Sequence, residues 1–182
     1  MRAVQTRIAG LLILEPRVFS DGRGSFFESF NRQVFRRLTG CEEDCVQENH
    51  SQSVRNVLRG LHYQIRQPQG KLVRVAAGEV FDVAVDLRQS SPTFGQWNGT
   101  LLSAENRRMS WVPQGFAHGF FVLSEFAEVL YKTTDYWAPE HERTILWSDP
   151  DLAIDWPLHG VAPILSKKDQ AAGSFREAEL FP

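Results

Sequence analysis

Residues 81–87 read Phe81-Asp82-Val83-Ala84-Val85-Asp86-Leu87, and large apolar side chains occupy every second position. A period of two is the pattern of a β-strand whose two faces meet different surroundings. One face carries the four large apolar side chains, and the other carries Asp82, Ala84 and Asp86. The pattern alone leaves open whether this second face points into a barrel or out to water.

Further short strand patterns lie on both sides of this segment, with turn signals between them. We expect strands within residues 57–64, 71–75, 101–103, 110–112, 119–123 and 127–133. The turns between strands carry Pro or Gly at residues 91–93, 113–115 and 138–140. Regularly spaced short strands favour a sandwich or a small barrel.

Two helices are expected outside the strands. Asn31 can cap the first helix with its side-chain oxygen. The apolar residues Phe30, Val34, Phe35 and Leu38 lie near one face of this helix. The second is short and begins near Asp169 or Gln170, after Ser166. The chain of 182 residues is predicted to be a single, mainly β domain spanning residues 1–182.

Composition limits the classes of partner. The net charge of −2 provides no bulk attraction to nucleic acid or to anionic membranes, so neither is an expected partner. Cys41 and Cys45 are too few for a disulfide framework and are interpreted as reduced thiols. The apolar run Ile8–Leu14 is only about seven residues long and precedes Glu15-Pro16-Arg17 rather than a cleavage site, so we expect a cytoplasmic protein.

Three side chains suited to carbanion chemistry lie between residues 59 and 71. Arg59 and His62 belong to one strand pattern, Lys71 begins the next, and the intervening Gln67-Pro68-Gln69-Gly70 predicts a hairpin. A His can accept a proton near neutrality, a Lys can stabilise an oxyanion, and an Arg can hold a phosphate. This combination needs neither a metal nor an organic cofactor.

Several long motifs in order give the chain a family resemblance. They include Arg59-Gly60-Leu61-His62-Tyr63-Gln64, Pro113-Gln114-Gly115-Phe116-Ala117-His118-Gly119-Phe120 and residues 78–88, 91–95, 102–106 and 130–135. The chain resembles the dTDP-4-dehydrorhamnose 3,5-epimerases of dTDP-L-rhamnose biosynthesis from about residue 8 to residue 169. The resemblance implies a cupin-type jelly-roll β-barrel, a homodimer, no metal or cofactor, and a dTDP-sugar bound inside the barrel.

Inverting a carbon beside a ketone requires a base on one face, a cation at the ketone oxygen and an acid on the opposite face. The resemblance implies that His62 is the base, Lys71 lies near the ketone oxygen and Tyr131 is the acid. It also pairs Asp169 with His62, while Asp82 is a rival partner for that imidazole. Regular alternation puts Arg59 and His62 on opposite faces of their strand, so we expect a bulge near Gly60.

The resemblance also implies a set of substrate-binding residues, and most of them are charged or aromatic. Arg59 and Lys168 are expected to hold the pyrophosphate together with Arg23, which lies in a glycine-flanked loop. Phe26 is expected to stack on the base. The remaining positions are Glu28, Gln47, Glu48, Asn49, His118, Trp137 and Glu142.

Three alternatives stay open from the sequence. Many relatives have a second tyrosine six residues after the first, where this chain has Trp137. We assign Trp137 to stacking on thymine, but an enzyme inverting only C3 or only C5 stays an alternative. A metal-dependent cupin could use His50, His62 and His118 as three ligands. A non-catalytic binder of sugar nucleotides is the third alternative.

Overall fold

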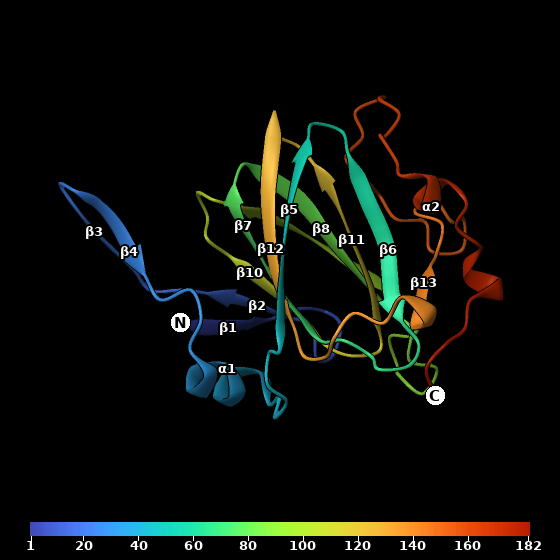
Figure 1. Cartoon of the computed structure of the whole chain (residues 1–182), viewed down its shortest axis with the longest axis horizontal. Coiled ribbons are helices and arrows are strands. Elements are labelled where there is room, and N and C mark those ends of the chain that lie inside the picture. Colours follow the sequence, from blue (N-terminus) through green and yellow to red (C-terminus); the bar gives the residue numbers. More distant parts are fainter.

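The computed structural model describes all residues from Met1 to Pro182. Two antiparallel sheets form the body of the molecule, and a separate hairpin projects from it (Figure 1). The six-stranded sheet has the order β1 (Arg2–Gln5), β2 (Leu12–Glu15), β10 (Met109–Val112), β7 (Lys71–Ala77), β12 (Phe126–Thr133) and β5 (Gln47–Val54). The five-stranded sheet has the order β13 (Glu142–Thr144), β6 (Leu58–Gln64), β11 (Phe116–Val122), β8 (Glu79–Asp86) and β9 (Trp97–Ser103).

The core between the sheets comes from both of them. Val73 and Val129 of the six-stranded sheet pack with Val80 and Phe120 of the five-stranded sheet in one buried cluster. Two facing antiparallel sheets wrapped around a common core form the cupin-type jelly roll. The predicted fold class, mainly β with a few short helices, is confirmed.

The acidic face of β8 points into the barrel. Asp82 is 2% exposed and bonds to His118 on the neighbouring strand β11. The opposite, apolar face packs outward against the C-terminal part of the chain, where Val83 and Val85 contact a cluster that includes Trp156. The alternation therefore separates a polar interior from an apolar outer face, which the C-terminal segment covers.

The hairpin predicted over residues 57–75 is wrong. Strand β6 pairs with β11 and β13, whereas β7 pairs with β10 and β12 in the other sheet. Residues 65–70 therefore cross from one sheet to the other instead of reversing the chain within one sheet. Both edges of each strand are already occupied by other partners, so the two strands cannot pair with each other.

The helices are short and capped by side chains. Asn31 accepts hydrogen bonds from the backbone of Gln33 and Val34 and caps α1 (Arg32–Thr39), as predicted. Helix α2 (Lys167–Gln170) begins slightly before the expected position, and Ser166 caps it. Two 3₁₀ turns, η1 (Pro139–His141) and η2 (Phe175–Glu177), are the other helical elements.

The apolar run near the N-terminus is part of the core. Ile8 and Leu14 are completely buried, and the run continues into strand β2. Neither helix has the length and apolar composition needed to span a bilayer. The remaining hairpin, β3 (Val18–Asp21) and β4 (Gly24–Phe27), pairs only with itself.

Candidate active site

A cavity of about 420 Å³ opens between the two sheets. Ten of the residues predicted from the sequence line it: Gln47, Asn49, Arg59, His62, Lys71, His118, Tyr131, Trp137, Glu142 and Lys168. They come from both sheets, from the loop after β12 and from α2. A volume of this size suits a small organic ligand.

His62 forms a hydrogen bond with Asp169 behind the cavity wall. The imidazole Nε2 lies 2.6 Å from the Asp169 Oδ1 atom, and the Asp169 side chain is 2% exposed. Because a carboxylate only accepts, the imidazole proton of neutral His62 is on Nε2, and Nδ1 is left without a hydrogen bond. Burial lowers the pKa of His62 although Asp169 opposes this shift, so the neutral imidazole is favoured.

The rival carboxylate serves a different imidazole. Asp82 Oδ2 lies 2.6 Å from Nε2 of His118, which stands directly opposite His62 in the pairing of β11 with β6. The imidazoles of the two pairs therefore lie on adjacent strands of the five-stranded sheet. Asp82 is engaged with His118, and Asp169 is the partner of His62.

Lys71 is a buried cation at the start of β7. Its Nζ donates a hydrogen bond to the backbone carbonyl of His62 at 3.2 Å, and the residue is 8% exposed. Burial lowers the pKa of Lys71 to about 8, although the nearby Glu142 opposes this shift. An ammonium group with so little hydration interacts strongly with any negative charge that develops in the cavity.

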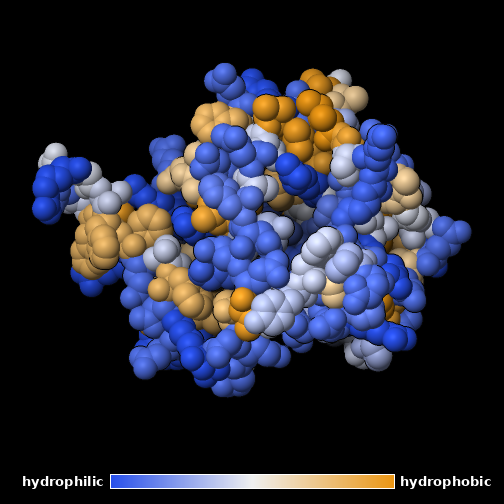
Figure 2. Space-filling view, in the orientation of Figure 1, coloured by the Kyte–Doolittle hydropathy of each residue, from blue (hydrophilic) through white to orange (hydrophobic).

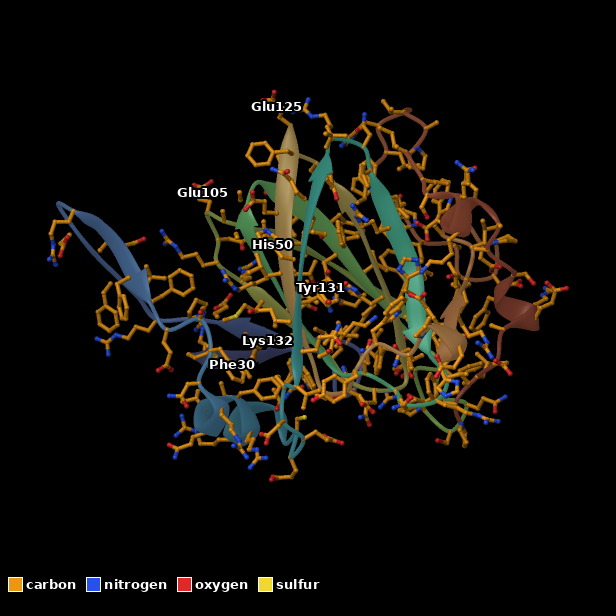
Figure 3. The ribbon with its side chains drawn as sticks, viewed as in Figure 1. Phe30, His50, Glu105, Glu125, Tyr131 and Lys132 are labelled. Carbon is orange, nitrogen blue, oxygen red and sulfur yellow. The ribbon has the colours of Figure 1, made fainter.

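Tyr131 faces the cavity from the other sheet. It lies on β12 in the centre of the molecule (Figure 3), whereas His62 lies on β6 of the five-stranded sheet. Burial raises the pKa of the Tyr131 phenol, so it is protonated at neutral pH. A phenol and an imidazole therefore approach the same space from opposite sheets.

The predicted irregularity near Gly60 is present. The register between β6 and β11 shifts between His118 and Phe120, and both Arg59 and His62 line the cavity. A Cβ atom on Gly60 would lie 2.6 Å from the Cα atom of Gly119, so the two strands approach too closely there for a side chain. The Arg59 Nε donates to Ser53 Oγ at 3.0 Å, which fixes the guanidinium at the cavity wall.

Polar contacts also hold the rim of the cavity. Lys168 on α2 forms an ion pair with Glu142 at 2.8 Å. The backbone N–H of Trp137 donates to Gln47 Oε1 at 3.1 Å, and the Trp137 residue is 58% exposed. The exposed indole therefore lies at the mouth of the cavity on a backbone that β5 holds in place.

Four residues predicted to bind substrate do not line the cavity. Glu48 alternates to the outer face of β5 and pairs with Lys132 at 2.9 Å. Arg23 and Phe26 lie on the projecting hairpin, and Glu28 follows it and bonds to Asn31. Within one chain, these three residues are separated from the cavity because the hairpin points away from the body (Figure 1).

The three histidines considered as metal ligands do not converge. His50 alternates to the outer face of β5, where its Nε2 lies 3.4 Å from Glu128. Each of His62 and His118 is bonded to its own carboxylate. No group of three or more His, Cys, Asp or Glu side chains is arranged to hold a metal ion.

Sequence reasoning missed several residues of the cavity wall: Ser51, Tyr63, Gln64, Gln69, Gly119 and Phe120. Strand alternation could have found three of them. Ser51, Gln64 and Phe120 each lie two positions from a predicted site residue on the same strand, and side chains two apart share a face. Gln69 lies in the crossing between the sheets, for which the sequence pattern gave no position.

A jelly roll with an imidazole and a phenol facing one cavity from opposite sheets defines a cupin-type enzyme suited to moving protons at carbon. Residues 5–177 match the family described as dTDP-4-dehydrorhamnose 3,5-epimerase, and the chain belongs to this family of isomerases. The resemblance drawn from the motifs is thereby confirmed.

Individual relatives cover nearly the whole chain. The dTDP-4-dehydrorhamnose 3,5-epimerase of Pseudomonas aeruginosa is 63% identical over 182 residues, with 100% of both chains covered. A crystal structure of dTDP-6-deoxy-D-glucose-3,5-epimerase from Legionella pneumophila in complex with dTDP-4-keto-L-rhamnose has a TM-score of 0.95 and 54% identity, covering 98% of this chain and 94% of that one. A 3′-monoepimerase from Streptomyces bikiniensis in complex with dTDP-quinovose is less similar, with a TM-score of 0.86, 34% identity and coverage of 96% and 87%.

Proposed function

We propose that this chain is a cofactor-independent isomerase that inverts C3 and C5 of dTDP-4-dehydro-6-deoxy-D-glucose to give dTDP-4-dehydro-L-rhamnose. The observation that carries the proposal is the placement of His62 and Tyr131 on opposite sheets around one cavity. Inversion requires a proton to leave one face of the sugar and another to arrive on the opposite face, so two groups must flank the ring.

The first step is removal of a proton from carbon. C3 and C5 both flank the C4 ketone, so loss of either proton places negative charge on O4. His62 accepts the proton at Nδ1, because its Nε2 proton is already donated to Asp169. Asp169 fixes the tautomer and stabilises the imidazolium that forms. Lys71 stabilises the enolate oxygen as a nearby buried cation.

The second step returns a proton to the opposite face. Tyr131 donates its phenolic proton to the enolate carbon, which restores the ketone with the configuration inverted. The phenolate and the imidazolium then exchange protons with solvent before the second carbon reacts. Burial keeps Tyr131 protonated before each donation, because it raises the pKa of the phenol.

Cations and aromatic rings hold the nucleotide. Arg59 and Lys168 line the cavity and are the candidates for the pyrophosphate. Trp137 at the mouth is the candidate for stacking on thymine, while Gln47 and Asn49 provide amides along the same wall. His118 and Glu142 complete the set of contacts.

The remaining predicted contacts imply a homodimer. Arg23 is largely exposed and Phe26 is 71% exposed on the projecting hairpin, where Figure 2 shows apolar side chains gathered. An aromatic side chain so exposed on a two-stranded hairpin has no packing role within its own chain. We infer that the hairpin of each protomer reaches the cavity of its partner, where Arg23, Phe26 and Glu28 contact the substrate.

We also propose that the enzyme is cytoplasmic and that residues 1–182 form one domain. Free cysteines support this location, because Cys41 and Cys45 form no disulfide and reduced thiols persist in a reducing compartment. The single-domain assignment is supported by the clusters that join both sheets and the C-terminal segment.

Incubation of the enzyme with the 4-keto sugar nucleotide in D₂O tests the reaction. Proton NMR should show deuterium at both C3 and C5, because each carbon loses its proton and regains one from solvent. Deuterium at one carbon only would identify a monoepimerase, an alternative that Trp137 keeps open. A substrate that binds but gains no deuterium would identify a non-catalytic binder.

Substitution of the base tests the mechanism. His62→Ala should abolish exchange at both carbons, because the proposed mechanism removes both protons with this one imidazole. His50→Ala is the matched control, since His50 lies on the outer face of β5. Unimpaired exchange in His62→Ala would rule out the assignment.

A further inference from the structure

Ser166 lies behind the pair formed by His62 and Asp169. Its Oγ donates a hydrogen bond to Asp169 Oδ2 at 2.8 Å, and the backbone N–H of Asp169 donates to the same Oγ at 3.1 Å. The other carboxylate oxygen, Oδ1, accepts from His62 at 2.6 Å. The hydroxyl therefore touches both the backbone and the side chain of the residue that holds the imidazole.

These contacts leave the carboxylate little rotational freedom. Asp169 is 2% exposed, and His62 and Ser166 are the only side chains that donate hydrogen bonds to it. With one donor on each oxygen, the plane of the carboxylate is fixed, and so is the direction in which Oδ1 meets the imidazole. Loss of one donor would let the group turn about its Cβ–Cγ bond.

The position of α2 makes this contact important. The helix is a single turn beside β6 (Figure 1), and its side chains Lys168 and Asp169 both serve the cavity. A helix of one turn gains little stability from its own hydrogen bonds. The N-cap contact of Ser166 is therefore the local interaction that sets where Asp169 lies.

We propose that Ser166 is a positioning residue for the base His62, an inference that rests on the proposed function. The serine hydroxyl acts on the imidazole through the carboxylate of Asp169. The Ser166 hydroxyl orients the carboxylate of Asp169, and this carboxylate holds the imidazole of His62 with Nδ1 available to the substrate. Ser166 itself does not touch the cavity.

Ser166→Ala tests the proposal, and the exposed site should tolerate the change. We expect kcat for deuterium exchange to fall roughly tenfold, the scale of a lost hydrogen bond to a charged group. KM and the Kd for dTDP should stay within about twofold, because the binding side chains are unchanged. A purely structural defect would weaken dTDP binding as well.

Two further variants separate the two roles of the hydroxyl. Ser166→Thr keeps both the cap and the donor, so it should restore kcat. Ser166→Asp keeps an acceptor for the backbone N–H but cannot donate to Asp169 and repels it, so kcat should stay low in a folded protein. Wild-type kcat in Ser166→Asp would overturn the proposal.

Ser174→Ala is the matched control. Ser174 also precedes a short helical turn and donates to the carboxylate of Glu177, three residues later, at 2.8 Å, but it lies outside the active site. This variant should keep the wild-type kcat. An equal loss in Ser174→Ala and Ser166→Ala would point to a general effect of losing a bond from a serine hydroxyl to a carboxylate, and it would overturn the proposal.

Proton NMR of the free enzyme provides a reading independent of turnover. The imidazole N–H that His62 donates to Asp169 should give a low-field signal that is lost in Ser166→Ala and kept in Ser166→Thr. Retention of this signal together with wild-type kcat in Ser166→Ala would overturn the role of Ser166. Persistent exchange in His62→Ala would instead contradict the proposed function, so the two failures are distinguishable.

Discussion

Among single residues, burial shifts the pKa values of His62, Lys71 and Tyr131 toward their neutral forms, whereas hydrogen bonds override burial at Asp169. Burial lowers the pKa of His62 and of Lys71, and it raises the pKa of Tyr131. Burial also opposes the ionisation of Asp169, but hydrogen bonds from His62 and Ser166 keep its pKa below the usual range. A neutral imidazole, a protonated phenol and an ionised carboxylate therefore coexist at neutral pH.

Tyr131→Phe should separate proton removal from inversion. His62 and Lys71 are intact in this variant, so exchange of the substrate protons with D₂O should continue. Inversion should slow by roughly 100-fold, within the range that general acid catalysis contributes. Product formation followed by chiral sugar analysis checks the result, and full inversion would move the acid role to another residue.

Lys71 should reduce the stability of the folded protein. Its pKa falls from the usual 10.5 to about 8, which corresponds to about 3 kcal/mol because each pKa unit is worth about 1.4 kcal/mol. Below pH 8 the folded protein must keep a buried charge, so Lys71→Met should increase the free energy of unfolding at pH 7 by up to this amount. The variant should be inactive.

The stability difference between Lys71→Met and the wild-type protein should depend on pH. Between pH 8 and pH 10.5 the unfolded chain binds the proton that the folded chain has lost, so the wild-type protein gains stability as the pH rises. The advantage of Lys71→Met should therefore shrink to nothing near pH 10.5. Urea unfolding at several pH values measures it, and a destabilised Lys71→Met at pH 7 would contradict this account.

At the scale of elements, the irregular pairing of β6 with β11 decides which side chains of β6 reach the cavity. Regular alternation would place Arg59 and His62 on opposite faces, whereas the register shift brings both to the cavity. The close approach of Gly60 and Gly119 makes this shift sterically possible. The bulge therefore brings the candidate phosphate ligand and the base to one substrate.

Gly60→Ala should disrupt both stability and catalysis. Its Cβ would lie 2.8 Å from the carbonyl oxygen of His118, and the backbone φ of +122° disfavours any side chain. We expect a loss of roughly 2–4 kcal/mol in unfolding free energy, combining overpacking with backbone strain. Gly173→Ala is the control, because nothing lies within 4 Å of its added Cβ. Equal stability of the two variants would show that the strands separate easily.

At the scale of the whole molecule, the projecting hairpin raises the question of which site it serves. Within one chain it lies away from the cavity, although the sequence places three substrate-binding candidates on or next to it (Figure 1). A two-fold symmetric dimer resolves this separation, because each hairpin can then complete the partner's site. If two chains share each site, two variants that are inactive alone should complement each other in a mixed dimer.

Mixed dimers of Arg23→Ala and His62→Ala should recover activity that neither variant has alone. In a mixed dimer, the protomer with an intact His62 receives an intact hairpin from its partner. Random mixing makes half of the dimers mixed with one working site each, so about a quarter of wild-type activity should return. Co-expression with two affinity tags measures this recovery. No recovery would place the hairpin at the site of its own chain.

Much of the fold could be predicted from the sequence. The alternation in residues 81–87, the cap at Asn31 and the motif around His62 depend on local spacing, and local spacing is enough to choose a strand, a helix start or a family. The sheet partners could not be predicted in this way. Strands β6 and β7 looked like a hairpin, but their edges pair with strands far away in sequence.

Local sequence patterns indicated the strands between residues 57 and 133, the helix cap at Asn31, the family and the chemical groups of the site. The packing of the two sheets was needed to show that the acidic face of β8 points inward, that Asp169 rather than Asp82 meets His62, and that Glu48 and His50 face outward. The physical reason is that secondary structure depends on neighbours along the chain. The environment of a side chain depends instead on which distant strands pack against it, and a pattern within one strand does not contain that information.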